Sequence, residues 1–169
     1  HRFSSNILDS LREALEGSLT DQSHDQEPLA WAETQNNLGN ILAAQGQQQR
    51  DAELYEKAIQ CFNSALVKFS QEKSPLDWAA TQYNLGTANQ ALGRQLDNAK
   101  LLNAAIDAYT NALLMWSRKE TPEKWASAMH QLGATFHAYG RLLKGNRTYQ
   151  KSAVAYKNAL AVFDADNYA

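Results

Sequence analysis

The sequence predicts an all-α fold, a solenoid of about seven helices arranged as antiparallel pairs. Proline, tryptophan and glycine recur at a fixed spacing of 47 residues, which is typical of stacked supersecondary units. Between them, apolar residues follow at intervals of three and four, the spacing of a buried helix face. Two helices joined by a short turn pack antiparallel. The recurring residues are Pro28, Pro75 and Pro122, then Trp31, Trp78 and Trp125, then Gly39, Gly86 and Gly133.

The period divides the chain into a leading segment and three repeats. Residues 1–27 are expected to form a helix followed by a polar loop. We interpret that helix as the second half of a preceding repeat, and a solubilising cap is the alternative. The repeats are expected at 28–74, 75–121 and 122–169, the last with a short tail, and to form one continuous array.

Each repeat is predicted to hold two helices. The first begins at the repeated proline, because proline at the first helical position loses only an amide that has no partner. Ser74 and Thr121 are expected to cap two of these helices with their hydroxyl oxygens. Gly46, Gly93 and Gly140 are expected to end the first helices in a left-handed conformation. The first helices are expected to end near Ala44, Ala91 and Ala138, and the second helices to span roughly 52–70, 99–117 and 146–164.

The three repeated tryptophans are interpreted as structural, and an exposed binding stripe is the alternative. Each lies one turn into a first helix, where we expect it to wedge against the end of the preceding second helix. Trp78 is expected to meet Phe69, Trp125 to meet Trp116, and Trp31 to meet Leu15 or Leu19.

These features resemble the tetratricopeptide repeat, in which Leu-Gly, a turn glycine and an Ala–aromatic–Ala set recur at fixed offsets. The resemblance covers residues 28–168 and implies a right-handed superhelical solenoid. The usual unit has 34 residues, and we expect the longer unit here to have longer helices rather than long loops. Units of this lengthened type look similar to arrays in bacterial multidomain proteins. The matching residues are Leu38–Gly39, Gly46, Ala58, Phe62 and Ala65; Leu85–Gly86, Gly93, Ala105, Tyr109 and Ala112; and Leu132–Gly133, Gly140, Tyr156 and Ala159, with Ser152 in place of the first alanine.

The resemblance implies a non-catalytic protein–protein interaction module without a cofactor. In this family the first helices line a concave groove that holds extended peptides or partner helices. The partner is expected to be a protein, a peptide or another domain of the parent chain, and a merely solvated face is the alternative. The groove residues implied are Asn36, Asn40, Tyr83, Asn84, Thr87, Gln90, His130, His137 and Arg141, with Glu33, Asn37, Ala43, Ala80, Ser127, Gln131 and Ala134 beside them.

A clamp for the acidic tail of chaperones, which some family members carry, is not expected. Asn40 and Asn84 fit two of its slots, but its cationic slots hold Asn36, Ser127 and Gln131. A carboxylate needs charge-assisted donors to offset its desolvation. We therefore expect the groove to favour a polar or weakly acidic peptide that makes aromatic contacts.

No catalytic or metal-binding constellation is predicted. His130 and His137 are seven residues apart on one helix, a rise of about 10.5 Å, which is too far to share one zinc ion. Cys61 lies between core positions and is interpreted as a structural thiol. No phosphate-binding loop motif is present in the sequence. We therefore expect a protein that is not an enzyme.

The charge and hydropathy of the chain limit the kinds of partner, and the charge distribution indicates a second candidate function. The net charge of −2 indicates no bulk attraction for nucleic acid or anionic membranes, and no apolar run approaches a membrane span. Residues 1–27 carry six acidic and two basic side chains, whereas residues 122–168 carry six basic and three acidic ones. This polarity favours end-to-end self-assembly as the alternative, through terminal helices at 3–19 and 154–163. The chain begins at His1 without a methionine, so we expect a piece of a longer protein and assign no compartment, the cytoplasm being favoured.

Overall fold

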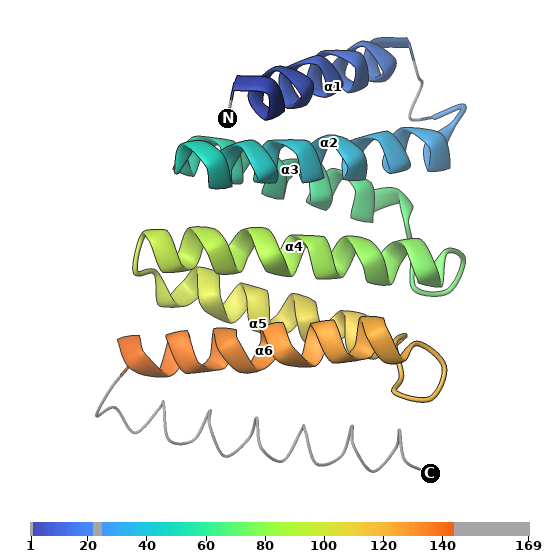
Figure 1. Ribbon diagram of the computed structural model, residues 1–169. Coiled ribbons are helices and arrows are strands. Elements are labelled where there is room, and N and C mark those ends of the chain that lie inside the picture. The colour runs from blue at the N-terminus through green and yellow to red at the C-terminus, as the bar shows by residue number, and fades with distance from the viewer. Residues whose placement is uncertain (1, 22–24, 144–169) are drawn as a thin grey trace.

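The computed structural model describes residues 2–21 and 25–143, and within those residues the chain forms six α-helices and no strand (Figure 1). The predicted all-α class is therefore confirmed. The helix predicted at 146–164 lies outside the described residues. The helices are α1 (Arg2–Asp21), α2 (Pro28–Gln49), α3 (Ala52–Lys68), α4 (Pro75–Gln95), α5 (Ala99–Leu113) and α6 (Pro122–Leu142).

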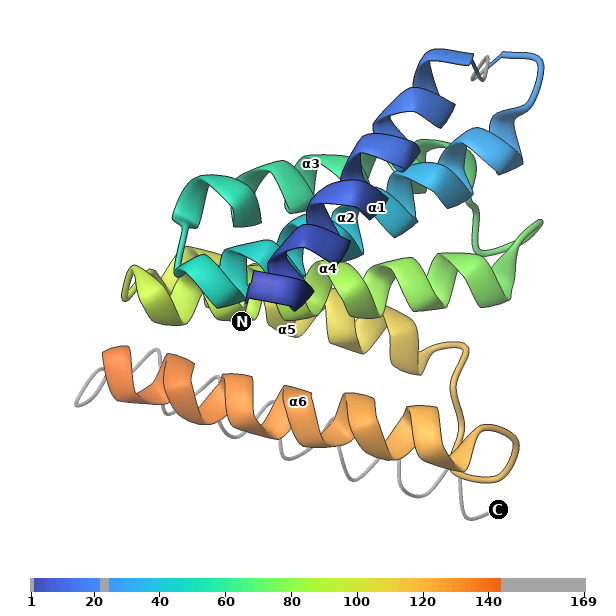
Figure 2. The ribbon, with the colours of Figure 1, turned by 45° about the horizontal axis from the view of Figure 1, so that its top comes forward.

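The helices pack in chain order (Figure 1). Helix α2 pairs with α3 and α4 pairs with α5, and each following pair begins against the helix before it, so that α4 contacts α3 and α6 contacts α5. Helix α1 crosses α2 obliquely and packs against it (Figure 2). Helix α4 also contacts both α2 and α6. The three helices expected to line a groove are therefore neighbours.

The first helices are longer than predicted. Helices α2, α4 and α6 contain 22, 21 and 21 residues, so each runs about one turn beyond its expected end. The left-handed residues that follow are Arg50, with φ 51°, and Asp97, with φ 48°. Gly46, Gly93 and Gly140 lie inside the helices and are buried, so the prediction that they end the helices is wrong.

Close approach between paired helices explains two of these glycines. A Cβ on Gly46 would lie 3.2 Å from the ring of Tyr55, and one on Gly93 would lie 2.8 Å from Leu102. Both positions therefore require the absence of a side chain where α2 meets α3 and α4 meets α5. The backbone itself is ordinary helix there, so no positive φ is needed.

The glycines of the Leu-Gly pairs have the same role nearer the middle of each helix pair. A Cβ on Gly39 would lie 2.5 Å from the ring of Phe62, and one on Gly86 would lie 2.7 Å from the ring of Tyr109. Both rings are completely buried. The close packing expected at these two glycines is therefore confirmed.

The predicted capping by Ser74 and Thr121 is wrong. Neither hydroxyl bonds to the helix that it precedes. Ser74 instead accepts from the amide of Ser70 at 2.9 Å and donates to its carbonyl at 3.2 Å. Thr121 makes the same two bonds with Ser117, at 2.9 and 3.1 Å. The hydroxyls close the loop between helix pairs, a local alternative that serine and threonine offer the backbone.

Side-chain capping occurs at the second helices. The Asp51 carboxylate accepts from the amide of Glu53 at 2.9 Å at the start of α3. At the start of α5, the side-chain oxygen Oδ1 of Asn98 accepts a hydrogen bond from the backbone amide of Leu101 at 3.1 Å. Each cap gives a hydrogen-bond acceptor to a backbone amide in the first turn of the second helix, and so marks where that helix begins.

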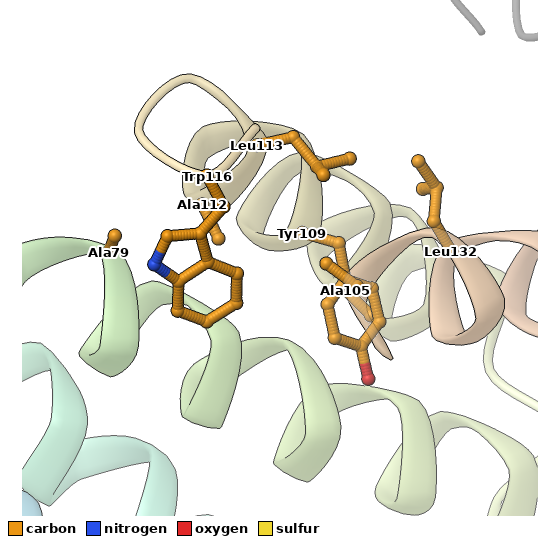
Figure 3. Packing of buried hydrophobic residues seen from close by; sticks show 8 residues of the cluster. Ala79, Ala105, Tyr109, Ala112, Leu113, Trp116 and Leu132 are labelled. Atoms are coloured by element: carbon orange, nitrogen blue, oxygen red, sulfur yellow. The ribbon is translucent and has the colours of Figure 1, made fainter. Parts of the chain in front are cut away.

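A buried cluster joins α4, α5 and α6 (Figure 3). Trp116 belongs to it and Trp125 packs against it, which confirms the predicted neighbourhood of Trp125. Trp78 packs both against this cluster and against the cluster that contains Phe69. The predicted wedge of Trp78 is therefore confirmed, and its side chain links two clusters.

Trp31 packs against the cluster that contains Phe69. Leu15 and Leu19 of α1 pack against a separate cluster around Leu38. The expected contact of Trp31 with Leu15 or Leu19 stays a prediction.

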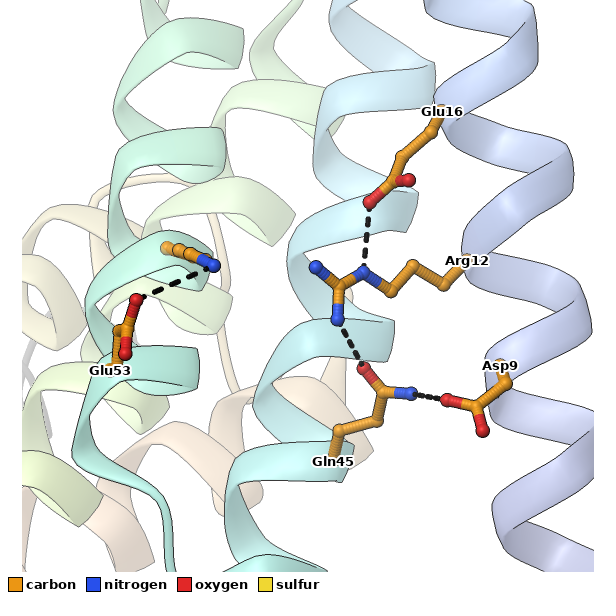
Figure 4. A network of polar contacts seen from close by, with 6 residues as sticks. Asp9, Arg12, Glu16, Gln45 and Glu53 are labelled. Carbon is orange, nitrogen blue, oxygen red and sulfur yellow. Dashed lines mark hydrogen bonds and ion pairs between the residues drawn. The ribbon is translucent and has the colours of Figure 1, made fainter.

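A polar network also holds α1 on α2 (Figure 4). The Gln45 side chain, only 2% exposed, donates its amide to Asp9 at 2.7 Å and accepts from Arg12 at 3.5 Å. Arg12 is paired in turn with Glu16 at 2.8 Å. The buried Gln45 amide therefore finds a partner for both its nitrogen and its oxygen on the neighbouring helix.

Candidate functional site

A cavity of about 510 Å³ lies along α2, α4 and α6. It brings together groove residues from all three repeats, although these residues are far apart in the sequence. The contact of α4 with both α2 and α6 positions them. The polar lining residues are Asn40, Gln47, Thr87, Gln90, Arg94 and Gln131.

The polar groups of this cavity differ in how free they are to bind a partner. The Gln90 side chain, 6% exposed, accepts from the Tyr109 hydroxyl at 2.5 Å and so belongs partly to the core. The Thr87 hydroxyl donates to the Asn84 carbonyl of its own helix at 2.8 Å. Within residues 2–21 and 25–143, no hydrogen bond engages the side-chain amides of Asn40 and Gln131. Those two amides remain available as donors and acceptors.

A second cavity of about 340 Å³ lies where α4 and α6 begin. Its lining includes Tyr83, Asn84 and Ser127, all placed in the groove by the resemblance, together with Trp116. The Tyr83 ring lies 5.6 Å from that of Tyr109 and 5.4 Å from that of Trp116, between ring centroids. Burial raises the pKa of the Tyr83 hydroxyl. Tyr83 is therefore as much a core residue as a groove residue.

Two other groove candidates have different surroundings. The Asn84 side chain donates to the Asn36 side chain at 3.1 Å, which links α4 to α2. Both asparagines are half-buried, so this pair contributes to helix packing. His130 is exposed and lines none of the three cavities described in this section.

A third cavity of about 320 Å³ lies between the ends of α4 and α6. His137 and Arg141, both implied by the resemblance, line it together with Arg94 and Asp97. Arg94 was not among the groove residues that the resemblance implies, although Arg141 was. A signal was present, since Arg94 precedes Arg141 by one full repeat of 47 residues.

The single cysteine lies outside these cavities. Cys61 on α3 is half-buried, and burial, with a smaller contribution from the charge of Glu16, raises its pKa to about 11 despite the opposing effect of Arg12. Its side chain is therefore a neutral thiol near pH 7, and a thiol is a weak nucleophile.

In the part of the chain that the structure describes, no group of three or more histidine, cysteine, aspartate or glutamate side chains is arranged to hold a metal ion. No helix within residues 2–21 and 25–143 has both the length and the apolar character needed to cross a membrane.

The three cavities offer amide hydrogen bonding, aromatic surface and positive charge along one set of neighbouring helices. This arrangement provides recognition groups from several helices at once. Comparison of the chain with models of protein families, with curated proteins and with solved structures gave no match.

Proposed function

We propose that this protein is a non-catalytic interaction scaffold that binds an extended segment of a partner protein along α2, α4 and α6. The observation that carries the proposal is the cavity of about 510 Å³ lined by residues of all three helices. An extended backbone presents unpaired amide and carbonyl groups, and the free amides of Asn40 and Gln131 are complementary to both. The resemblance to tetratricopeptide repeats, and the right-handed solenoid that it implies, support the same proposal.

A display selection with random twelve-residue peptides tests this function. The selected peptides are titrated against the wild-type chain and against an Asn40→Arg/Gln131→Arg variant, in which two bulky side chains fill the cavity. We expect the variant to bind about tenfold more weakly, since groove contacts contribute most of the affinity.

The matched control is Gln60→Arg/Asn103→Arg, which adds the same side chains at exposed positions of α3 and α5. It is expected to bind like the wild type. Equal affinities for the two double variants would show that the α2–α4–α6 face is not the site. Failure to enrich any peptide would contradict the proposed function itself.

Self-assembly is the second candidate, and one observation favours it. Helix α1 leaves Ile7 and Leu11 exposed at 58% and 45%. We propose a second copy of this chain as their occupant, because the acidic residues 1–27 and the basic residues 122–168 are complementary in charge. Ile7→Ser/Leu11→Ser is then expected to abolish a concentration-dependent increase in mass measured by analytical ultracentrifugation. A wild-type chain that stays monomeric at high concentration would remove this candidate.

A further inference from the structure

We infer that the cavity between the ends of α4 and α6 binds a carboxylate of the partner segment, held by Arg94 and Arg141 beside His137. The inference rests on the proposed function and deepens it, because a charged anchor at one end fixes the direction in which the segment lies. The cavity measures about 320 Å³.

Two arginines converge on this cavity from successive repeats. Arg94 lies in the last turn of α4 and Arg141 in the last turn of α6, at positions one repeat apart. His137 precedes Arg141 by one helical turn and lines the same cavity. A guanidinium presents a planar set of N–H donors that matches the two oxygens of a carboxylate.

The donors of these residues are uncommitted. Within residues 2–21 and 25–143, no hydrogen bond or ion pair engages the side chains of Arg94, His137 or Arg141. All three side chains are exposed, so no burial prevents a ligand from reaching them. An arriving carboxylate would not have to displace an existing partner.

The remaining lining favours a single negative charge. Leu102 and the half-buried Ala138 make part of the wall of this cavity apolar. Asp97 is the one acidic residue in the described lining of this cavity. It leaves Arg94, Arg141 and Asp97 with a combined charge of +1. One carboxylate, with its single negative charge, neutralises that charge.

The arginine cavity and the proposed groove share one lining residue. Arg94 lines both this cavity and the larger one that contains Asn40 and Gln131. A segment that pairs with those amides would therefore reach the arginines at the helix ends. These arginines also lie nearer the helix ends than the slots of the chaperone-tail clamp, which hold neutral residues here.

Nuclear magnetic resonance titration of the full chain with small compounds tests the inference. The probes are N-acetylglutamate N′-methylamide for a side-chain carboxylate, N-acetylglycine for a chain-terminal one, N-acetylglutamine N′-methylamide as the neutral match, and inorganic phosphate. We expect saturable shifts of the Arg94 and Arg141 Nε–H resonances, and a Kd about tenfold lower for at least one carboxylate than for the glutamine compound. Whichever carboxylate binds more tightly identifies its source, and either result supports the site.

Two charge-matched variants test whether the response is specific to the arginines. Their titrations are followed at the resonances of Leu102 and Ala138. Arg94→Gln/Arg141→Gln is expected to lose the saturable response. Lys73→Gln/Lys119→Gln removes the same charge from exposed loop positions before α4 and α6, and is expected to keep it. Equal binding of both carboxylate compounds and the glutamine compound, tighter binding of phosphate than of either carboxylate, or an equal loss in both variants would each overturn the inference.

The peptide selection and the carboxylate titration test different claims, so either can fail while the other succeeds. Peptides that require the α2–α4–α6 face, combined with carboxylates that leave the arginines unshifted, would remove the carboxylate site and keep the scaffold. A selection that enriches no peptide would remove the partner segment, and with it the assignment of the carboxylate to that segment.

Discussion

At the scale of single residues, glycine shows how one residue type acts through its missing side chain. Gly39 and Gly86 lie against the fully buried rings of Phe62 and Tyr109, where a Cβ would approach to 2.5 and 2.7 Å. Contacts this short force a shift of the ring or of the helix. Gly17 on α1 is also helical, but a Cβ added there would have no neighbouring atom within 4 Å. Alanine should therefore have opposite effects at these two kinds of site.

Gly39→Ala is expected to destabilise the protein by up to about 2 kcal/mol in urea unfolding. Overpacking a core typically costs about 1–3 kcal/mol, and the better helix propensity of alanine returns about 1 kcal/mol. Gly17→Ala is the matched control and is expected to stabilise by about 0.5–1 kcal/mol, because only the propensity term applies. A stabilised Gly39→Ala would show that the two helices separate at no cost, contrary to the packing described.

At the scale of elements, the helix pairs are joined through repeated loops and one bridging tryptophan. The Ser70–Ser74 and Ser117–Thr121 loops close with the same hydroxyl bonds, which fixes where each first helix begins. Trp78 then packs against two clusters, one on each side of α4. The tryptophan therefore connects the first helix pair with the rest of the described chain.

Trp78→Ala is expected to reduce the free energy of unfolding by about 3 kcal/mol, the lower end for a large aromatic residue because Trp78 is half-buried. Leu76→Ala, in the same turn but 65% exposed, is expected to change it by less than about 0.5 kcal/mol. Thermal and urea unfolding measure both. Similar melting temperatures for wild type and Trp78→Ala would mean that the tryptophan does not join the clusters.

At the scale of the whole molecule, α1 is attached differently from the helices that follow. Gln45 is buried on α2 and depends on α1 for its hydrogen bonds, whereas the position one repeat later is the buried Leu92. Arg12 on α1 likewise corresponds to Ile59 on α3. Polar contacts thus replace part of the apolar contact at this end of the stack, and one broken bond should affect α1 most.

Asp9→Ala is expected to destabilise the protein by about 1–2 kcal/mol, because it leaves the buried Gln45 amide without an acceptor. In a Gln45→Leu background the same substitution should cost almost nothing, so a double-mutant cycle should give a coupling of about 1–2 kcal/mol. Glu13→Ala, at an exposed position of α1, is the control. Additive effects of Asp9 and Gln45 would contradict the network, and hydrogen exchange should locate the loss in α1.

Much of the fold could be predicted from the repeat, and the errors have physical causes. The prolines marked the starts of α2, α4 and α6 because proline suits the first helical position. The ends were predicted too early because Gly46 and Gly93 were interpreted as left-handed caps, whereas packing against Tyr55 and Leu102 is what requires them. Arg94 was not predicted, although it lies one repeat before Arg141, because the cavity that both line exists only once α4 and α6 pack together.

The sequence by itself determined the all-α class, the register of the repeat and the residue types along each helix. Local rules are sufficient for these, since apolar spacing and proline placement act within one helix. Only the tertiary structure decided that Tyr83 meets Tyr109 and Trp116, and that Arg94 and Arg141 line one cavity. Those contacts depend on how far each helix extends and on how closely glycine lets its partner approach, and both are settled between helices rather than along the chain.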